Sequence, residues 1–235
     1  LYRYLGDKRN EAVMLGNQGL VVEAQGDLAA AATYIQQALI IAREIGDRGS
    51  EMLHLNNLGG LYGKLGRHEA ALTHLQPLLA MPSARQVPFL AEAYANLSEV
   101  LLAQGQTEEA FAAATQSLTL AQERQHPILL GQAWYALGRV LALGLTTTAT
   151  MDNIPPVADC FARSVEQFAA ANLGQEQAEV LRAWAVYEQK QGDEARGRVL
   201  HDLIHHTRPG GAPYPMQECP IDRARPERSE VRDHE

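Results

Sequence analysis

The sequence predicts an all-α fold, an α-solenoid of antiparallel helix pairs. The first observation is a glycine or other small residue that recurs in steps of 40, 39, 40 and 47 residues. The second is a large apolar residue four positions before each small residue, and the third is a glycine seven positions after most of them, where a helix would end. The small residues are Gly19, Gly59, Ser98, Gly138 and Ala185, the large ones are Leu15, Leu55, Tyr94, Trp134 and Leu181, and the turn glycines are Gly26, Gly66, Gly105 and Gly192.

The second unit shows the pattern most clearly. Leu55, Leu58 and Tyr62 lie at i, i+3 and i+7, which places them on one face of a helix. Gly59 lies on that face, and Ala71 on the return helix is nearly as small. We therefore expect the two backbones to approach each other closely at this point, and the same arrangement to recur along the chain.

Two units depart from the regular pattern. Pro77 falls inside the second return helix, where proline removes a backbone hydrogen bond and clashes with the preceding turn, so this helix should kink or end early, with its exit at residues 81–83. The fourth unit carries an insert near residues 144–154 that contains three consecutive threonines, which favour helix poorly. The insert is either a tolerated loop extension or a functional one, and Val157 takes the return-helix position after it.

The pattern divides the chain into an end piece, an array and a tail. Residues 1–10 resemble the end of a preceding unit's second helix, because Leu5-Gly6-Asp7 parallels Ile45-Gly46-Asp47, so we expect the chain to begin within a longer array. The tail is rich in proline, glycine and charge and cannot bury enough apolar surface to fold alone. We expect five helix pairs within 11–207, at about 11–50, 51–90, 91–130, 131–175 and 176–207, followed by the tail at 208–235.

These motifs resemble the tetratricopeptide repeat (TPR) family, whose unit reads W-x2-L-G-x2-Y followed by A-x3-F. Trp134-x2-Leu137-Gly138 fits the opening as written, and residues 55–62 fit it with leucine in place of tryptophan. The period near 40 residues is longer than the usual 34 and is similar to the repeats of kinesin light chains, spindle-orientation adaptors, and the helical arms of bacterial signalling ATPases and transcription regulators. The resemblance implies a right-handed superhelix over residues 11–207.

Composition excludes several classes of protein. A formal net charge of −8 argues against a nucleic-acid-binding surface, which needs a basic stripe. The apolar runs are too short for a transmembrane helix, and two distant cysteines, Cys160 and Cys219, do not make a disulfide framework. We expect a cytoplasmic protein that binds neither nucleic acid nor membrane.

Candidate binding residues lie on the first helices, which should form the inner wall of the superhelix. Asn17, Asn57 and Asn96 stand two positions before the small residue, and an amide can both donate to and accept from a peptide backbone. In the similar kinesin and spindle-adaptor arrays, asparagines at this place hold the bound peptide, so the resemblance implies that role here. The alternative is that they form hydrogen bonds between helices of the array. Neighbouring inward positions complete the candidate peptide-binding set with Asn56, Lys64, Glu99, Tyr135 and Arg139.

No catalytic, cofactor or metal site is expected. Gly63-Lys64 lacks the hydroxyl residue and the first glycine of a phosphate-binding loop, so it should be a helix end. His201 and His205 are spaced as a metal pair, but no third ligand follows in motif spacing. Lys64 and Arg139 alone are too few for the carboxylate clamp of chaperone-binding arrays.

The sequence therefore predicts a non-enzymatic scaffold, a TPR module of a larger regulatory or signalling protein that binds an extended protein segment on its concave face. The partner would be another protein or another domain of the same polypeptide. In one version of this hypothesis the array holds an attached ATPase or DNA-binding domain inactive. The alternative is a sensor domain for a small molecule or signal peptide, which controls an attached ATPase or DNA-binding domain and has a pocket near Trp134, Tyr135 and Trp184.

Overall fold

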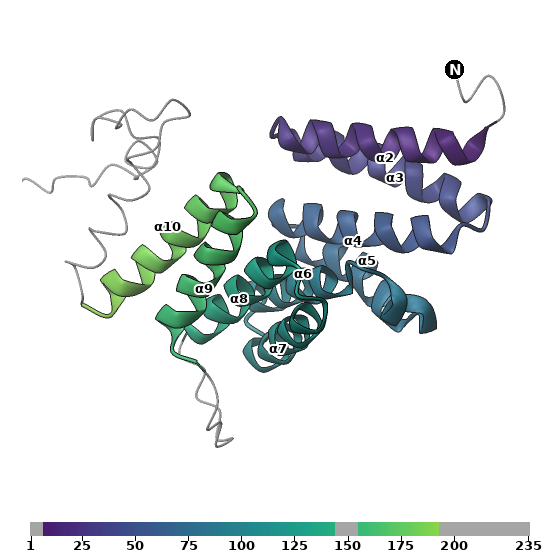
Figure 1. Cartoon of the computed structure of the whole chain (residues 1–235). Helices are drawn as coiled ribbons and strands as arrows, with labels where there is room; N and C mark the ends of the chain where they lie inside the picture. Colours follow the sequence, from purple (N-terminus) through teal and green to yellow (C-terminus); the bar gives the residue numbers. More distant parts are fainter. Residues whose placement is uncertain (1–6, 144–154, 193–235) are drawn as a thin grey trace, which may run out of the picture. The chain divides into compact units, whose positions relative to one another are not determined.

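The computed structural model describes residues 7–143 and 155–192. These residues form α-helices and one short 3-10 helix with no strand among them, which confirms the all-α solenoid (Figure 1). The expectations for residues 1–6, for the insert, and for everything after Gly192 lie outside the described residues. The elements are α2 (Lys8–Ala24), α3 (Leu28–Glu44), α4 (Arg48–Lys64), α5 (His68–Ala80), η1 (Pro82–Gln86), α6 (Leu90–Ala103), α7 (Thr107–Arg124), α8 (Pro127–Leu141), α9 (Val157–Ala170) and α10 (Gly174–Lys190).

Helices α2 to α9 form four successive pairs. In each pair a first helix packs along the return helix that follows it: α2 with α3, α4 with α5, α6 with α7 and α8 with α9 (Figure 1). The return helices α3, α5 and α7 also contact the first helix that follows them, and the first helices contact one another from α4 to α6 and from α6 to α8. Helix α10 belongs to a separate unit and is described by itself. Within α10 the Trp184 indole donates a hydrogen bond to the Glu188 carboxylate at 2.7 Å.

Glycine ends the first helices as the spacing predicts. Gly26, Gly66, Gly105 and Gly192 have φ values of +89°, +69°, +76° and +83°, a region that glycine adopts without steric cost. The residue after the glycine then returns its amide to the helix, as when Arg67 N donates to the Tyr62 carbonyl at 2.8 Å. These turns bring the return helix back along the first one.

The recurring small residue receives a large side chain of the return helix. A methyl group added at Gly59 would lie 2.5 Å from Leu75 Cγ, and one added at Gly19 would lie 2.5 Å from Ile35 Cγ1. Gly138 meets Phe161 in the same way at 3.1 Å. The sequence predicts a close approach of two backbones at this point. In the structure it is mainly a side chain of the return helix that approaches the backbone of the first helix. This side chain stands four residues after the small position of the return helix.

Buried serines add polar contacts to this packing. Ser98 takes the place of the small glycine in α6, and its hydroxyl donates to the Ala110 carbonyl at 2.8 Å. From the return helices, Ser117 donates to the Ala91 carbonyl and Ser164 to the Gly131 carbonyl, each at 2.7 Å. Each hydroxyl is satisfied, so no buried donor opposes close packing.

Helix α5 ends early, as Pro77 predicts. It stops at Ala80, and the chain leaves through Met81 in an extended conformation into η1, which begins with Pro82. The shorter helix leaves room for η1 in the same core as α4, where Ser83 Oγ donates to Met52 Sδ at 3.5 Å.

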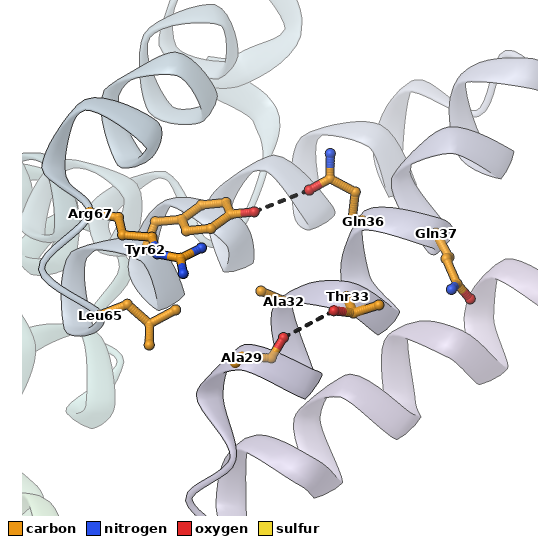
Figure 2. Close-up of a pocket in the computed structure, with 8 residues that line it drawn as sticks. All are labelled: Ala29, Ala32, Thr33, Gln36, Gln37, Tyr62, Leu65 and Arg67. Carbon is orange, nitrogen blue, oxygen red and sulfur yellow. Dashed lines mark hydrogen bonds between the residues drawn. The ribbon is translucent and has the colours of Figure 1, made fainter.

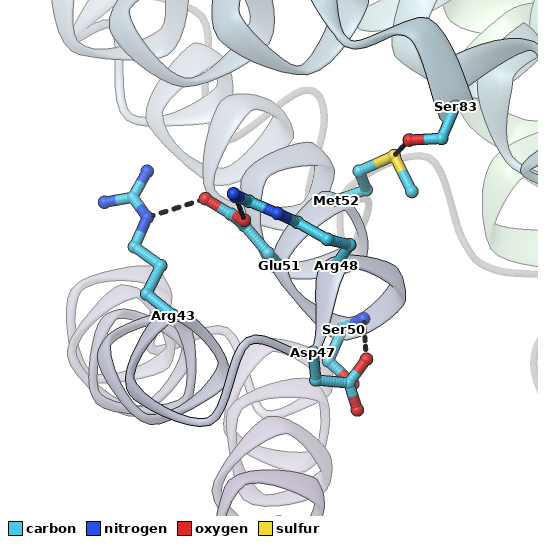
Figure 3. Close-up of polar contacts among 7 residues, drawn as sticks. All are labelled: Arg43, Asp47, Arg48, Ser50, Glu51, Met52 and Ser83. Carbon is cyan, nitrogen blue, oxygen red and sulfur yellow. Dashed lines mark hydrogen bonds and ion pairs between the residues drawn. The ribbon is translucent and has the colours of Figure 1, made fainter.

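A buried carboxylate joins the first two pairs (Figure 3). Glu51 of α4 accepts hydrogen bonds from Arg43 Nε of α3 at 2.9 Å and from Arg48 Nη1 at 2.6 Å. Burial alone would raise the pKa of Glu51, but the two guanidinium groups outweigh it and hold the pKa below its ordinary value. Glu51 is thus ionised at neutral pH and ties the end of α3 to the start of α4.

Candidate protein-binding face

The first helices present a common face that is turned away from their return helices. A helix rotates by about 100° per residue, so positions six and two before each small residue, and one and five after it, lie within about 60° of one another and about 100–160° around the helix from the small residue. We call these positions in α2, α4, α6 and α8 the first-helix face. They are Val13, Asn17, Leu20 and Ala24; Leu53, Asn57, Gly60 and Lys64; Glu92, Asn96, Glu99 and Ala103; and Gln132, Ala136, Arg139 and Leu143.

The three asparagines of the proposed ladder occupy different environments on this face. Asn17 is exposed, whereas Asn57 and Asn96 are half-buried. Asn96 Nδ2 donates to Oδ1 of Asn56 at 3.3 Å, and Asn56 is fully buried. The alternative of hydrogen bonding within the array therefore holds for Asn96, and Asn56 lies behind it rather than in solvent. Of this set, Asn17 is thus the exposed amide, and Asn57 is half-buried.

Ion pairs link neighbouring first helices across the same face. Lys64 Nζ of α4 lies 2.8 Å from Glu23 Oε1 of α2, and Arg139 Nη1 of α8 pairs with Glu99 Oε2 of α6. The Arg139 guanidinium also lies 5.7 Å from the centre of the Tyr135 ring. Three of the predicted site residues, Lys64, Glu99 and Arg139, thus lie in two ion pairs that join successive helix pairs at separations of 41 and 40 residues.

Glu92 on this face has a perturbed carboxyl group. Burial raises its pKa above the ordinary value, and the nearby Glu23 carboxylate acts in the same direction, while the Asn56 amide and Lys64 oppose the shift. Glu92 lies six positions before Ser98, and its closeness to Asn56 depends on how α4 and α6 stack. The Asn56–Asn96–Glu92 group is therefore a polar cluster in the centre of the face.

Four exposed apolar side chains on this face were not predicted as site residues from the sequence. Val13, Leu20, Leu53 and Leu143 are all exposed large hydrophobic residues. The signal that finds them is their register: each lies six positions before, or one or five after, its small residue. On α2 and α4 three of them surround Asn17 and Asn57, so the face there combines amide and aliphatic groups.

A pocket of about 360 Å³ lies between α3 and the turn from α4 to α5 (Figure 2). The Tyr62 hydroxyl points across it and donates to Gln36 Oε1 at 3.2 Å. Neither Trp134 nor Tyr135 lines it, and Trp134 is buried beneath the Arg163 guanidinium, 4.7 Å from the ring centre. This pocket is thus not lined by the residues near which the sensor alternative expects a ligand. Its lining is Ala29, Ala32, Thr33, Gln36, Gln37, Tyr62, Leu65 and Arg67.

Cys160 and the Gly63-Lys64 motif both lie among the described residues. Burial raises the pKa of the Cys160 thiol to about 11, so it is protonated and unreactive near neutral pH. Gly63 and Lys64 are the last two residues of α4, a helix end as expected. Within residues 7–143 and 155–192, no three His, Cys, Asp or Glu side chains gather closely enough to hold a metal ion, and no helix is long and apolar enough to cross a membrane.

Comparison with known proteins identifies the repeat. Tetratricopeptide repeat profiles match residues 10–84 and 91–124. The array is a TPR array. A search of curated proteins gives no sequence match to this chain. TPR repeats generally mediate protein–protein interactions, and folds of this kind are typically non-enzymatic scaffolds.

Solved structures show the same TPR fold at low sequence identity. A candidate kinesin light chain from Podosopora anserina with nearly identical TPR-like repeats is 13% identical, with a TM-score of 0.57 over 83% of this chain and 94% of that one. A point variant of it gives a TM-score of 0.58 over 83% and 93%. BtubC (BKLC) from P. vanneervenii is 17% identical, with a TM-score of 0.53 over 87% of this chain and 91% of that one.

Proposed function

We propose that this TPR array is a non-enzymatic scaffold that binds an extended protein segment on the first-helix face. The observation that supports the proposal is the surface of α2 and α4, where the exposed Asn17 and the half-buried Asn57 share the first-helix face with the exposed Val13, Leu20 and Leu53. Amides suit an extended backbone, whose N–H and C=O groups need partners, and the aliphatic groups suit the side chains between them.

The contacts between first helices support a preformed surface. The Glu23–Lys64 pair, the Asn96–Asn56 hydrogen bond and the Arg139–Glu99 pair each hold one helix against the next. Binding to such a surface costs less free energy than binding to a flexible one, because the side chains of the surface are already ordered. In this proposal Asn17 and Asn57 contact the partner backbone, while Asn56 acts through Asn96.

The charged residues would set which segments are accepted. Lys64 and Arg139 already face carboxylates, so an acidic partner side chain must compete with Glu23 or Glu99 for them. Tyr135 holds the Arg139 guanidinium over its ring and thereby limits its reach. We infer a partner segment that is mainly neutral where it crosses α2 and α4, supplied by another protein or by another domain of the same regulatory polypeptide.

Selection from a random peptide library displayed on phage tests the proposal. Enriched peptides should bind the chain in fluorescence anisotropy, and Asn17→Ala/Asn57→Ala should weaken them about tenfold or more, because each lost hydrogen bond contributes about 0.5–1.5 kcal/mol. The control is Gln122→Ala, an exposed amide on α7. The melting temperature of the double variant should stay within a few degrees of wild type. Unchanged peptide affinity in that folded variant would refute the assignment of these two residues.

A further inference from the structure

The pocket between α3 and the turn from α4 to α5 differs in chemistry from the first-helix face (Figure 2). The Arg67 guanidinium and the side-chain amides of Gln36 and Gln37 line it and can donate hydrogen bonds to a ligand. Gln36 Oε1 already accepts from the Tyr62 hydroxyl at 3.2 Å. Donors therefore outnumber acceptors in this pocket.

The pocket exists because small residues line the junction of the first two helix pairs. Forty positions later, at the junction of the second and third pairs, Glu69 takes the place of Ala29 and Leu72 takes the place of Ala32. Gln104 Nε2, from the end of α6, donates to Glu69 Oε1 at 2.8 Å there. The second junction is thus bridged by its own side chains, whereas the two alanines leave the first one open.

Arg67 serves neither an ion pair nor the helix that it precedes. Among the described residues, no carboxylate pairs with its guanidinium. At the start of α3 the same position is Asp27, whose carboxylate caps the helix by accepting from Ala30 N at 2.9 Å. Arg67 makes no such side-chain bond to α5, although its own amide is held by the Tyr62 carbonyl at 2.8 Å. The turn therefore fixes the base of this side chain and leaves its charge unmatched.

We propose that this pocket binds the carboxylate of an acidic side chain from a protein partner, at a second contact separate from the first-helix face. A guanidinium presents a planar fork of N–H groups that matches a carboxylate, and the two glutamine amides can donate to the same anion or to the adjoining peptide group. Ala29, Ala32 and Leu65 give an aliphatic lining for the methylene groups of the side chain.

The exposure of the pocket favours a side chain of a protein over a free small molecule. Thr33, Gln36, Gln37 and Arg67 are all exposed, so the walls leave much of any occupant in contact with water. Sites for free small molecules bury most of the ligand surface. An acidic side chain that belongs to a protein needs less enclosure, because the rest of the partner supplies further contacts.

Nuclear magnetic resonance titration of the ¹⁵N-labelled chain tests this proposal. The probe is N-acetyl-glutamate methylamide, a glutamate side chain between two peptide groups. We expect saturable shifts of the Arg67 Nε–Hε signal and of the Gln36 and Gln37 side-chain amides. N-acetyl-glutamine methylamide, which has the same shape without the charge, should bind about fivefold or more weakly, because hydrogen bonds to charged groups contribute more than neutral ones. Acetate should also bind more weakly than the glutamate probe.

Two variants taken from the second junction remove the site without an unfamiliar side chain. Arg67→Gln supplies the residue that stands at this position before α7, and Ala29→Glu supplies the counterpart of Glu69 as an internal competitor for Arg67. Each should abolish the saturable shifts while the melting temperature stays close to that of wild type. The control is Arg85→Gln, which removes an exposed cation of η1 and should leave the shifts unchanged.

The inference is separable from the proposed function. Asn17→Ala/Asn57→Ala should bind the glutamate probe as wild type does, whether or not those asparagines hold a partner. Equal binding of the glutamate and glutamine probes, shifts that persist in Arg67→Gln, or no saturable shift in wild type would each overturn the proposal. Acetate that binds as tightly as the glutamate probe would also overturn it, since the pocket would then hold a free anion only.

Discussion

The packing at Gly59 allows a prediction whose sign is decided by geometry. Gly59→Ala places a methyl group 2.5 Å from both Leu75 Cγ and Cδ2, well inside normal contact, and Leu75 is fully buried. Overpacking of this kind costs about 1–3 kcal/mol. The helix propensity of alanine over glycine returns about 1 kcal/mol. We therefore expect a net loss of stability of up to about 2 kcal/mol, and a larger loss for Gly59→Leu.

Gly49→Ala is the matched control. It lies in the first turn of the same helix, where an added methyl group meets Asp47 Oδ1 at 3.6 Å, an ordinary contact. This substitution should stabilise the chain by about 0.5–1 kcal/mol. Urea and thermal unfolding followed by circular dichroism measure both variants, and opposite shifts of the midpoint are expected.

A double-mutant cycle assigns the effect to the proposed contact. Leu75→Ala alone should cost about 2–5 kcal/mol as a cavity mutation. In the Gly59→Ala background it should cost at least about 1 kcal/mol less, because it also relieves the clash. The reasoning fails if Gly59→Ala stabilises the chain as Gly49→Ala does, or if the two substitutions at this crossing are additive.

Two further predictions concern buried ionisable groups. Glu51→Gln should destabilise the chain by about 1 kcal/mol at pH 7 relative to the exposed control Glu123→Gln, since it weakens contacts to Arg43 and Arg48 that are themselves partly solvent-exposed. Because the pKa of Glu51 is lower in the folded than in the unfolded chain, the stability difference between the Glu51→Gln variant and its control should be complete above about pH 5. It should fade as the pH falls through the folded-state pKa. Urea titrations measure this, and a stability difference that grows on acidification would contradict the ion pairs. In a Cys219→Ser background, Cys160 should react with a thiol reagent at pH 8 only when the chain is unfolded by urea, because its thiol is buried and has a pKa of about 11. Rapid labelling of the folded chain would show that α9 does not pack as described.

The helix pairs were predictable because they depend on contacts close in sequence. The glycines seven positions after the small residues need only a local left-handed turn. Each of them has a positive φ: Gly26, Gly66, Gly105 and Gly192. Pro77 likewise predicts the early end of α5 from a steric conflict within one helix. Local rules of this kind require no knowledge of how one pair meets the next.

The candidate site was less predictable because it depends on stacking between pairs. The sequence pattern marks both Asn56 and Asn96 as inward-facing amides, yet in the stacked array Asn56 is fully buried and Asn96, which donates to it, is half-buried. The same dependence places Glu92 near Asn56 and pairs Arg139 with Glu99. Leu53 was overlooked because an aliphatic residue on a helix is ordinarily assigned to the core, and only its register reveals that it faces outward.

Site-specific photo-crosslinking tests the central claim most directly. A photoreactive benzoylphenylalanine at Leu53, an exposed apolar position of the first-helix face, should crosslink the peptides selected by phage display. The same group at Ile40, which is similarly exposed on the return helix α3, should not. Crosslinking at Leu53 alone is the result expected if the first helices bind the partner. Crosslinking at Ile40 with none at Leu53 would contradict that account and place the binding surface on the return helices.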